Sequence, residues 1–315
     1  MRSELDPDSS DLAATSQNWF SGSRIWRRFP LLVTDSKERQ ERTPWWLWPN
    51  VLNLDAPVVA VVWQGAFARM VGVDLSAEHH WLMALAVWEV YFLDRWLDAR
   101  RGGHDATDRH RFHGRVGKGG LALAVVIGFG GVALALHCLN GAGWRYATIL
   151  LALTGGWFLS THFRPGIGRL LPKELSVGII FAAGCLVQPL SFAPEGVDPI
   201  HMPVGAVLFA WLCFQNCASI TVWESLPTDA NDPRSLLNGW SRAVRWIPRL
   251  GLAHLAICAF VLALALPPAF GQLVCALTLS SALLWALNHR ARERRPQLSR
   301  ALADIALLTP LIFLI

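Results

Sequence analysis

Residues 118–139 read KGGLALAVVIGFGGVALALHCL, and this stretch decides the fold class. Lys118 stands at its first position, and the residues that follow are apolar, small or uncharged. A helix needs about 20 such residues to cross the roughly 30 Å of hydrocarbon in a bilayer. Because lipid offers no water to the backbone N–H and C=O groups, such a segment must form its hydrogen bonds internally. The stretch therefore predicts a membrane-spanning helix.

Comparable apolar runs recur along the chain of 315 residues. Hydrophobic residues make up 53% of the sequence and charged residues 16%, against roughly 25% charged residues in soluble domains. The mean hydropathy is +0.35. We predict an all-α polytopic membrane protein of about nine transmembrane helices. The expected segments are 51–72, 77–98, 118–139, 144–163, 174–192, 203–224, 246–266, 268–288 and 300–315.

The first and last segments depart from a continuous apolar run. Asn53, Asp55 and Pro57 interrupt the first segment, and the last one is short. Residues 1–49 contain no apolar run of the kind a secretory signal needs. We expect this part to be a disordered cytoplasmic tail, followed by a transmembrane domain at 50–315.

Basic residues alternate between the connections. The connections without Lys or Arg, near 73–80, 140–143, 193–202 and 266–271, alternate with basic ones at 99–118, 164–173, 225–245 and 289–300. This positive-inside pattern predicts that the N-terminus is cytoplasmic and the C-terminus lies outside, in a bacterial inner membrane. The net charge of +5 is spread between apolar runs, so we expect membrane lipids or an anionic substrate as partners, and no nucleic acid.

A first acidic motif closes the second predicted helix, which ends VWEVYFLDRWLDARRG at 87–102. Asp94 and Asp98 are four residues apart and so share one helix face. Two such carboxylates repel each other, and Mg²⁺ commonly binds one or two carboxylates together with substrate phosphates. Arg95 and Arg101 could then hold diphosphate oxygens. The alternative is an ordinary charged helix end, in which the aspartates pair with these arginines.

A second acidic motif closes the sixth predicted helix, which ends NCASITVWESLPTDANDPRS at 216–235. Glu224 and Asp229 are predicted to reach the same membrane surface as the first motif. Asn216 lies well inside the apolar run, where a polar group is costly and often functional. An interhelical hydrogen bond would also explain this asparagine.

A basic segment, THFRPGIGRLLPKE at 161–174, is predicted to face the same side. It supplies Arg164, Arg169 and Lys173. Two acidic clusters at helix ends, four helices apart, together with this segment predict a site that binds an anion through metal ions.

At these residues the chain resembles the UbiA superfamily of intramembrane prenyltransferases. That family has nine helices and aspartate-rich motifs at the cytoplasmic ends of the second and sixth. Asp94 and Asp98 match the second half of the first motif, N-D-x-x-D-x-x-x-D, whereas Val90 and Tyr91 stand at its Asn and first Asp. The segment WESLPTDAND is similar to the second motif, and the basic segment resembles the family's diphosphate-contacting loop.

The resemblance implies Mg²⁺-dependent transfer of a prenyl group from a prenyl diphosphate to a membrane-soluble acceptor. The departing diphosphate would be stabilised electrostatically, and the allylic cation would be captured in a site that excludes water. The implied metal-binding and catalytic residues are Asp94, Asp98, Glu224 and Asp229. The implied diphosphate-binding residues are Arg95, Arg101, Arg164, Arg169, Lys173 and Asn216.

Two other functions stay open. A UbiA-like protein that has lost catalysis would bind isoprenoid or lipid, and the missing half of the first motif favours it. A transporter would have broken helices at matching positions of two halves, and Pro57 and Pro189 do not match in that way. The D-x-x-D-G pattern of a CDP-alcohol phosphotransferase is absent.

Overall fold

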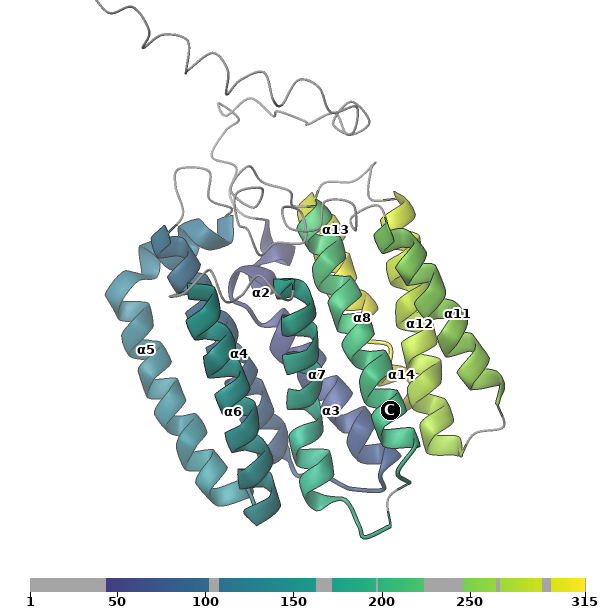
Figure 1. Cartoon of the computed structure of the whole chain (residues 1–315). Helices are drawn as coiled ribbons and strands as arrows, with labels where there is room; N and C mark the ends of the chain where they lie inside the picture. Colours follow the sequence, from purple (N-terminus) through teal and green to yellow (C-terminus); the bar gives the residue numbers. More distant parts are fainter. Residues whose placement is uncertain are drawn as a thin grey trace, which may run out of the picture. The chain divides into compact units, whose positions relative to one another are not determined.

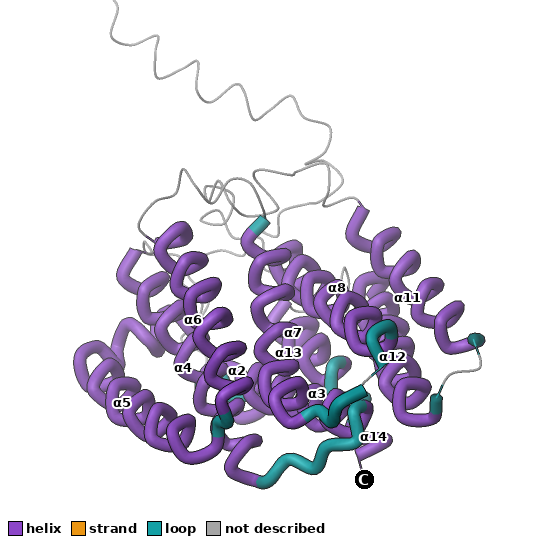
Figure 2. The backbone as a smooth tube through the Cα atoms, turned by 60° about the horizontal axis from the view of Figure 1, so that its bottom comes forward, coloured by secondary structure: helices purple, strands orange, loops and turns teal. Residues whose placement is uncertain are grey.

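The computed structural model describes residues 44–101, 108–162, 172–196, 198–223, 246–264, 267–290 and 296–314. Within these ranges every regular element is a helix (Figure 2). The elements are η2 (Trp45–Leu47), α2 (Trp48–Val51), α3 (Asp55–Met70), α4 (Ala77–Arg101), α5 (Asp108–Cys138), α6 (Gly141–His162), α7 (Lys173–Phe192), α8 (His201–Trp223), α11 (Ile247–Ala263), α12 (Pro268–Arg290), α13 (Pro296–Ala306) and α14 (Leu311–Leu314). The all-α prediction is confirmed for this part of the chain. The predicted tail falls largely on residues 1–43, which lie outside the described ranges.

Five of the described helices are long and apolar enough to cross a membrane. They are Gly119–Cys138 of α5, the helices α7, α8 and α12, and Pro296–Leu314, which includes α13 and α14. The bent pair formed by Trp45–Val51 and α3 would make a sixth span. These helices indicate an integral multi-pass membrane protein. Each predicted segment overlaps a described helix, but the count of nine spans stays a prediction.

The helices pack side by side along a common direction (Figure 1). α7 and α8 pack against each other in the middle, and α3 contacts α7. On one side α5 packs on α4, and α6 packs on α7. On the other side α11 and α12 form a pair that contacts α8, and α13 joins α8 and α12. α13, near the end of the chain, thus returns to the bundle interior.

Three connections that lack Lys and Arg lie at one end of the bundle. They join α3 to α4, α5 to α6, and α7 to α8, and Figure 1 shows them together at the bottom. The C-terminal end of α8 and the start of α13 lie at the opposite end (Figure 1). We call this opposite end the α13-start end.

The first predicted segment is broken where Asn53 and Asp55 interrupt its apolar run. The helix axis turns by 72° between Trp45–Val51 and α3, and Asn53 adopts a left-handed φ of 56° at the break. Pro57 lies in the first turn of α3, where its missing N–H costs no intrahelical hydrogen bond. The indole N–H of Trp88 on α4 donates to the Leu52 carbonyl at 3.0 Å. This hydrogen bond fixes the bend against α4.

The last predicted segment is broken as well. α13 ends at Ala306 and α14 begins at Leu311. The buried indole N–H of Trp63 on α3 donates to the Leu307 carbonyl at 2.8 Å, and Thr309 donates to the Ala276 carbonyl of α12 at 2.8 Å. The Leu307 carbonyl at the break thus finds a partner on α3, as a buried break in a membrane requires, and the Thr309 hydroxyl ties the break to α12.

Candidate functional site

Four polar side chains meet near the α13-start end, and we call them the carboxylate cluster. They are Asn50 of α2, Asp55 at the first position of α3, Asn216 of α8 and Asp304 of α13. Both asparagines are buried, and both aspartates are half-buried. The bend between α2 and α3 brings Asn50 and Asp55 close together, so the cluster depends on the broken first segment.

Hydrogen bonds connect the members of the cluster. The Asn50 amide nitrogen donates to Asp55 and lies 3.5 Å from Asp304 Oδ2. The Asn216 amide nitrogen donates to Asp304 Oδ1 at 3.3 Å. The carboxyl groups of Asp55 and Asp304 are themselves within hydrogen-bonding reach of each other. Two carboxyl groups this close need a shared proton or a cation between them.

Charged and polar groups surround the cluster. Arg300, one turn before Asp304 on α13, is buried and attracts that carboxylate. Tyr91 on α4 lies near both aspartates and near Arg95. Arg95 comes from the acidic end of α4, and its Nε atom is buried without a hydrogen-bond partner. The site therefore holds carboxylates and guanidinium groups together in a mainly apolar bundle.

The cluster lies below the helix ends. Asn216 precedes the end of α8 by seven residues, which is about 10 Å at 1.5 Å per residue. Asp304 follows the start of α13 by eight residues, or about 12 Å. Polar groups at this depth in a membrane protein are expensive and mark functional positions.

The first acidic motif lies on the adjoining part of α4. Asp94 and Asp98 are half-buried, and each interacts with a neighbouring group. Tyr91, Arg95 and Asp98 are spaced by four and three residues and so lie along one face of α4. The face that carries Asp98 therefore leads down to the carboxylate cluster.

The remaining predicted site residues are only partly described by the structure. Lys173 is the first residue of α7 and half-buried, and Asn216 belongs to the cluster itself. Arg101 is the last residue of α4, and its side chain is outside the description. Outside the described residues lie Arg164, Arg169, Glu224 and Asp229. The structure thus brings Arg95 and Asn216 to one site and does not test the second motif.

The donor set of the cluster suits a hard cation. Magnesium prefers oxygen ligands, and two aspartates with an amide oxygen supply them. The amide oxygen of Asn216 is buried and has no hydrogen-bond partner among the described residues. No group of three or more His, Cys, Asp or Glu side chains forms a metal site among the described residues. A metal here would therefore take its remaining ligands from water or substrate.

Sequence reasoning did not assign Asp55 or Asp304 to the site. Asp55 stands out in the sequence only as an interruption of the first run. In the structure Asp304 is attracted by Arg300, one turn before it on α13. The available signal was an ionisable residue inside each terminal span, which by default indicates a functional position. The sequence could not show that the first and last spans lie side by side. Asn50 and Asp304, which meet in the cluster, are 254 residues apart.

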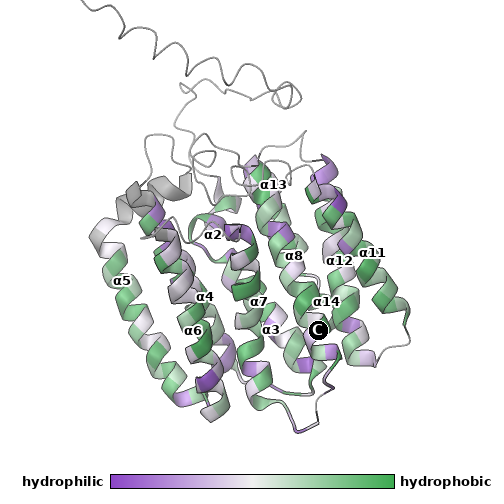
Figure 3. Ribbon diagram, viewed as in Figure 1, coloured by the Kyte–Doolittle hydropathy of each residue, from purple (hydrophilic) through white to green (hydrophobic). Residues whose placement is uncertain are grey.

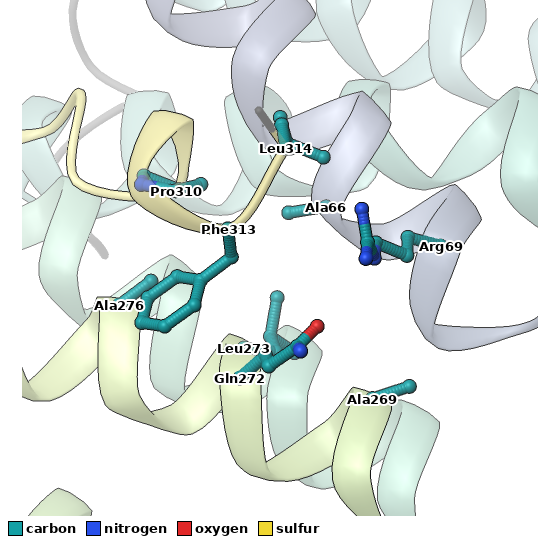
Figure 4. Close-up of a pocket in the computed structure, with 9 residues that line it drawn as sticks. All are labelled: Ala66, Arg69, Ala269, Gln272, Leu273, Ala276, Pro310, Phe313 and Leu314. Carbon is teal, nitrogen blue, oxygen red and sulfur yellow. The ribbon is translucent and has the colours of Figure 1, made fainter.

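A small hollow lies away from the carboxylate cluster, between α3, α12 and α14 (Figure 4). Its lining is apolar apart from Arg69 and Gln272, and Figure 4 shows Phe313 and Leu314 closing one side. With few polar groups and no buried charge, it offers less chemistry than the carboxylate cluster.

Two further groups of buried polar side chains form hydrogen bonds between helices. Gln64 donates to Gln188 at 2.6 Å and contacts His80 at 2.9 Å, which ties α3 to α7 and α4. His254 contacts Ser281 at 2.8 Å and the Leu208 carbonyl at 3.0 Å. These groups have the partners expected of interhelical hydrogen bonds.

Comparison with protein-family models, with curated proteins and with solved structures finds no match for this chain. The functional argument therefore rests on the residues themselves.

Proposed function

We propose that the chain is a magnesium-dependent prenyltransferase of UbiA type, with nine transmembrane helices in a bacterial inner membrane and a cytoplasmic N-terminus. It would transfer a prenyl group from a prenyl diphosphate to a membrane-soluble acceptor. One observation carries the proposal. The bundle brings together two half-buried aspartates, two buried asparagines and two arginines next to the face of α4 that carries the first acidic motif.

The chemistry of the site matches a diphosphate in lipid. The guanidinium groups of Arg95 and Arg300 supply the charge-assisted hydrogen bonds that diphosphate oxygens accept. Bound magnesium would neutralise charge that develops on the leaving diphosphate. Asp94 and Asp98, together with Glu224 and Asp229, are the proposed metal ligands at the membrane surface. Arg101, Arg164, Arg169 and Lys173 would complete the diphosphate contacts there.

Aromatic groups near the site suit an allylic cation. Trp88 and Phe92 on α4 stack with ring centroids 5.0 Å apart, and Tyr91 lies between them in the sequence. An aromatic ring face attracts a cation, most strongly where water is excluded. The apolar helix surfaces offer the prenyl chain the same environment as the lipid from which it comes.

The test is binding of a long-chain prenyl diphosphate to the full chain purified in detergent. We expect binding that requires magnesium and is lost in Asp94→Asn. The matched control Glu195→Gln removes an exposed carboxylate from the connection between α7 and α8 and should bind normally. Equal binding without magnesium and in Asp94→Asn would rule out the metal site. Absence of binding in folded protein would favour the non-catalytic lipid-binding alternative.

A transporter is the second candidate, and the two broken segments favour it. Asp55 begins α3 directly after one break, and Asp304 lies in the last turn of α13 before the other. Discontinuous helices with polar groups at the break are the usual place for a transported substrate or coupling ion. Cation-driven uptake by reconstituted proteoliposomes, together with absence of prenyl diphosphate binding, would establish this candidate instead.

A further inference from the structure

The carboxylate cluster joins the first and last predicted spans through α8. Its polar groups come from α2, α3, α8 and α13, four elements that meet only in the folded chain. Two observations separate it from an ordinary interhelical hydrogen bond. It places two carboxyl groups within hydrogen-bonding reach of each other, and it leaves a buried amide oxygen without a partner.

The unpaired oxygen belongs to Asn216. This side chain is only 8% exposed, and its amide nitrogen donates to Asp304 Oδ1. The reverse amide orientation would set its oxygen against the Asp304 carboxylate, so the hydrogen bond fixes which atom is left over. A buried carbonyl oxygen without a donor costs free energy unless a ligand supplies one. Among the described residues the Asn216 Oδ1 atom is thus a buried acceptor without a donor, on the same amide group that contacts Asp304.

The charge balance around the cluster agrees with a cation. The acidic groups are Asp55, Asp304 and the buried Glu174 of α7, which acts on the neighbouring Cys217. The basic groups are Arg95 and Arg300. Tyr91 and Cys217 complete the surroundings as uncharged groups. Among the described residues the surroundings thus combine three carboxyl groups with two guanidinium groups, and the adjoining carboxyl groups of Asp55 and Asp304 need a shared proton or a cation.

Tyr91 links the carboxylate cluster to the first acidic motif. Tyr91 stands where the pattern N-D-x-x-D-x-x-x-D would have its first aspartate. In the fold, Tyr91 lies within electrostatic reach of both Asp55 and Asp304. Carboxylates from α3 and α13 therefore act on the part of α4 where the pattern would have its first aspartate.

We infer that Asp55, Asp304 and the amide oxygen of Asn216 bind a divalent cation between α3, α8 and α13. These groups replace the carboxylate that the first acidic motif lacks. Magnesium takes an octahedral set of oxygens and usually keeps several positions for water or phosphate. Three protein ligands leave about half of that set for a diphosphate, with Arg95 and Arg300 beside it. The catalytic role of this cation rests on the proposed function, whereas the cation site itself does not.

The experiment uses Mn²⁺, which accepts the same oxygen ligands and reports its binding by electron paramagnetic resonance. The full chain in detergent is titrated without any prenyl diphosphate. We expect bound Mn²⁺ that Mg²⁺ displaces, and an affinity at least about tenfold lower in Asp55→Asn and in Asp304→Asn. Glu195→Gln, the matched control at the other end of the bundle, should retain the affinity of the unaltered protein.

A third variant tests the site even if Asp55→Asn and Asp304→Asn do not fold. Asn216→Asp places a third carboxylate at the unpaired oxygen and should tighten Mn²⁺ binding several-fold. If the cluster were only structural, the new charge beside Asp304 would lower thermal stability and leave Mn²⁺ binding unchanged. Mn²⁺ affinity that is the same in all folded variants, or absent from the unaltered chain, would overturn the inference.

The two hypotheses fail in different ways. If prenyl diphosphate binding needs Asp94 while Mn²⁺ binding ignores Asp55 and Asp304, the proposed function stands and this site is wrong. If Mn²⁺ binding needs Asp55 and Asp304 while no prenyl diphosphate binds, the cation site stands and the prenyltransferase proposal is wrong.

Discussion

Helices α5 and α8 are both apolar enough to cross a membrane, but they occupy opposite environments. In the apolar part of α5, 11% of the residues are buried, against 50% in α8, although α5 has the higher mean hydropathy. In a soluble protein the more apolar helix would be the more buried one. The reversal is what lipid produces, because hydrocarbon accepts exposed apolar side chains without cost.

The side chains of the two helices follow the same division. Val126, Phe129 and Leu136 of α5 are all more than half exposed, and Figure 3 shows the hydrophobic colour along this helix. Gln215 and Asn216 of α8 are buried in the bundle. In this protein, polar groups therefore mark the interior. Side chains that bind a ligand or a metal are therefore expected on α8 and its neighbours.

The largest effect is expected from a charge on the lipid-facing side of α5. Phe129 is 73% exposed and lies near the middle of Gly119–Cys138. A lysine there costs about 3 kcal/mol for insertion at the centre of a span. Leu136→Lys is the matched control, because near the helix end the amine can reach the headgroups. A glycosylation-based insertion assay measures both, and equal insertion would mean that α5 does not face lipid.

A smaller loss is expected from a methyl group between α7 and α8. A Cβ atom on Gly178 would lie 2.7 Å from the Phe214 backbone nitrogen and 3.0 Å from the Ala210 carbonyl oxygen. Gly178→Ala must push the helices apart, at a cost of about 1–3 kcal/mol in unfolding free energy.

The control for this change is on α5. Gly131→Ala has open space within 4 Å of the new Cβ, and alanine favours a helix by about 1 kcal/mol over glycine. We expect unfolding in mixed detergent to show destabilisation for Gly178→Ala alone. Equal stability of the two variants would contradict the close packing of α7 on α8.

A single hydrogen bond in the interior should matter less. Trp63 is fully buried, stacks on Phe209 with ring centroids 4.3 Å apart and donates to the Leu307 carbonyl. Trp63→Phe keeps the aromatic packing but removes the donor, which we expect to cost about 1–2 kcal/mol. Trp81→Phe, at a position that is 65% exposed, should be neutral in the same thermal unfolding assay. A loss of the same size in both variants would remove the hydrogen bond as its cause.

The sequence predicted the helices well because a span needs only a run of apolar residues. The interruption at Asn53, Asp55 and Pro57 coincides with the break between α2 and α3, although the prediction was a single segment over 51–72. The interior face of each helix was not predictable in the same way. Lipid-facing and buried faces are both apolar in this protein, so periodicity does not distinguish them.

The candidate site was predicted only in part. Asn216 and Arg95 were chosen from the sequence, and both lie at the carboxylate cluster. Asp55 and Asp304 were not chosen, because their meeting depends on how the first helix packs against the last. Such packing between distant segments leaves no local signal, and the intramembrane charges were the available clue.

The smallest effect is expected outside the membrane, at the start of α8. Asp198 Oδ1 accepts the backbone N–H groups of Ile200 and His201 at 2.7 and 3.2 Å. These hydrogen bonds favour the carboxylate and lower the pKa of Asp198. Its contribution to stability is therefore present above about pH 4 and is lost as the pH falls through the lowered folded-state pKa. We expect Asp198→Ala to reduce the melting temperature slightly at neutral pH. Asp198→Ser, which keeps an oxygen acceptor without charge, should restore much of the loss and remove its acid dependence. An identical pH profile for the unaltered chain and Asp198→Ser would show that this carboxylate does not anchor α8.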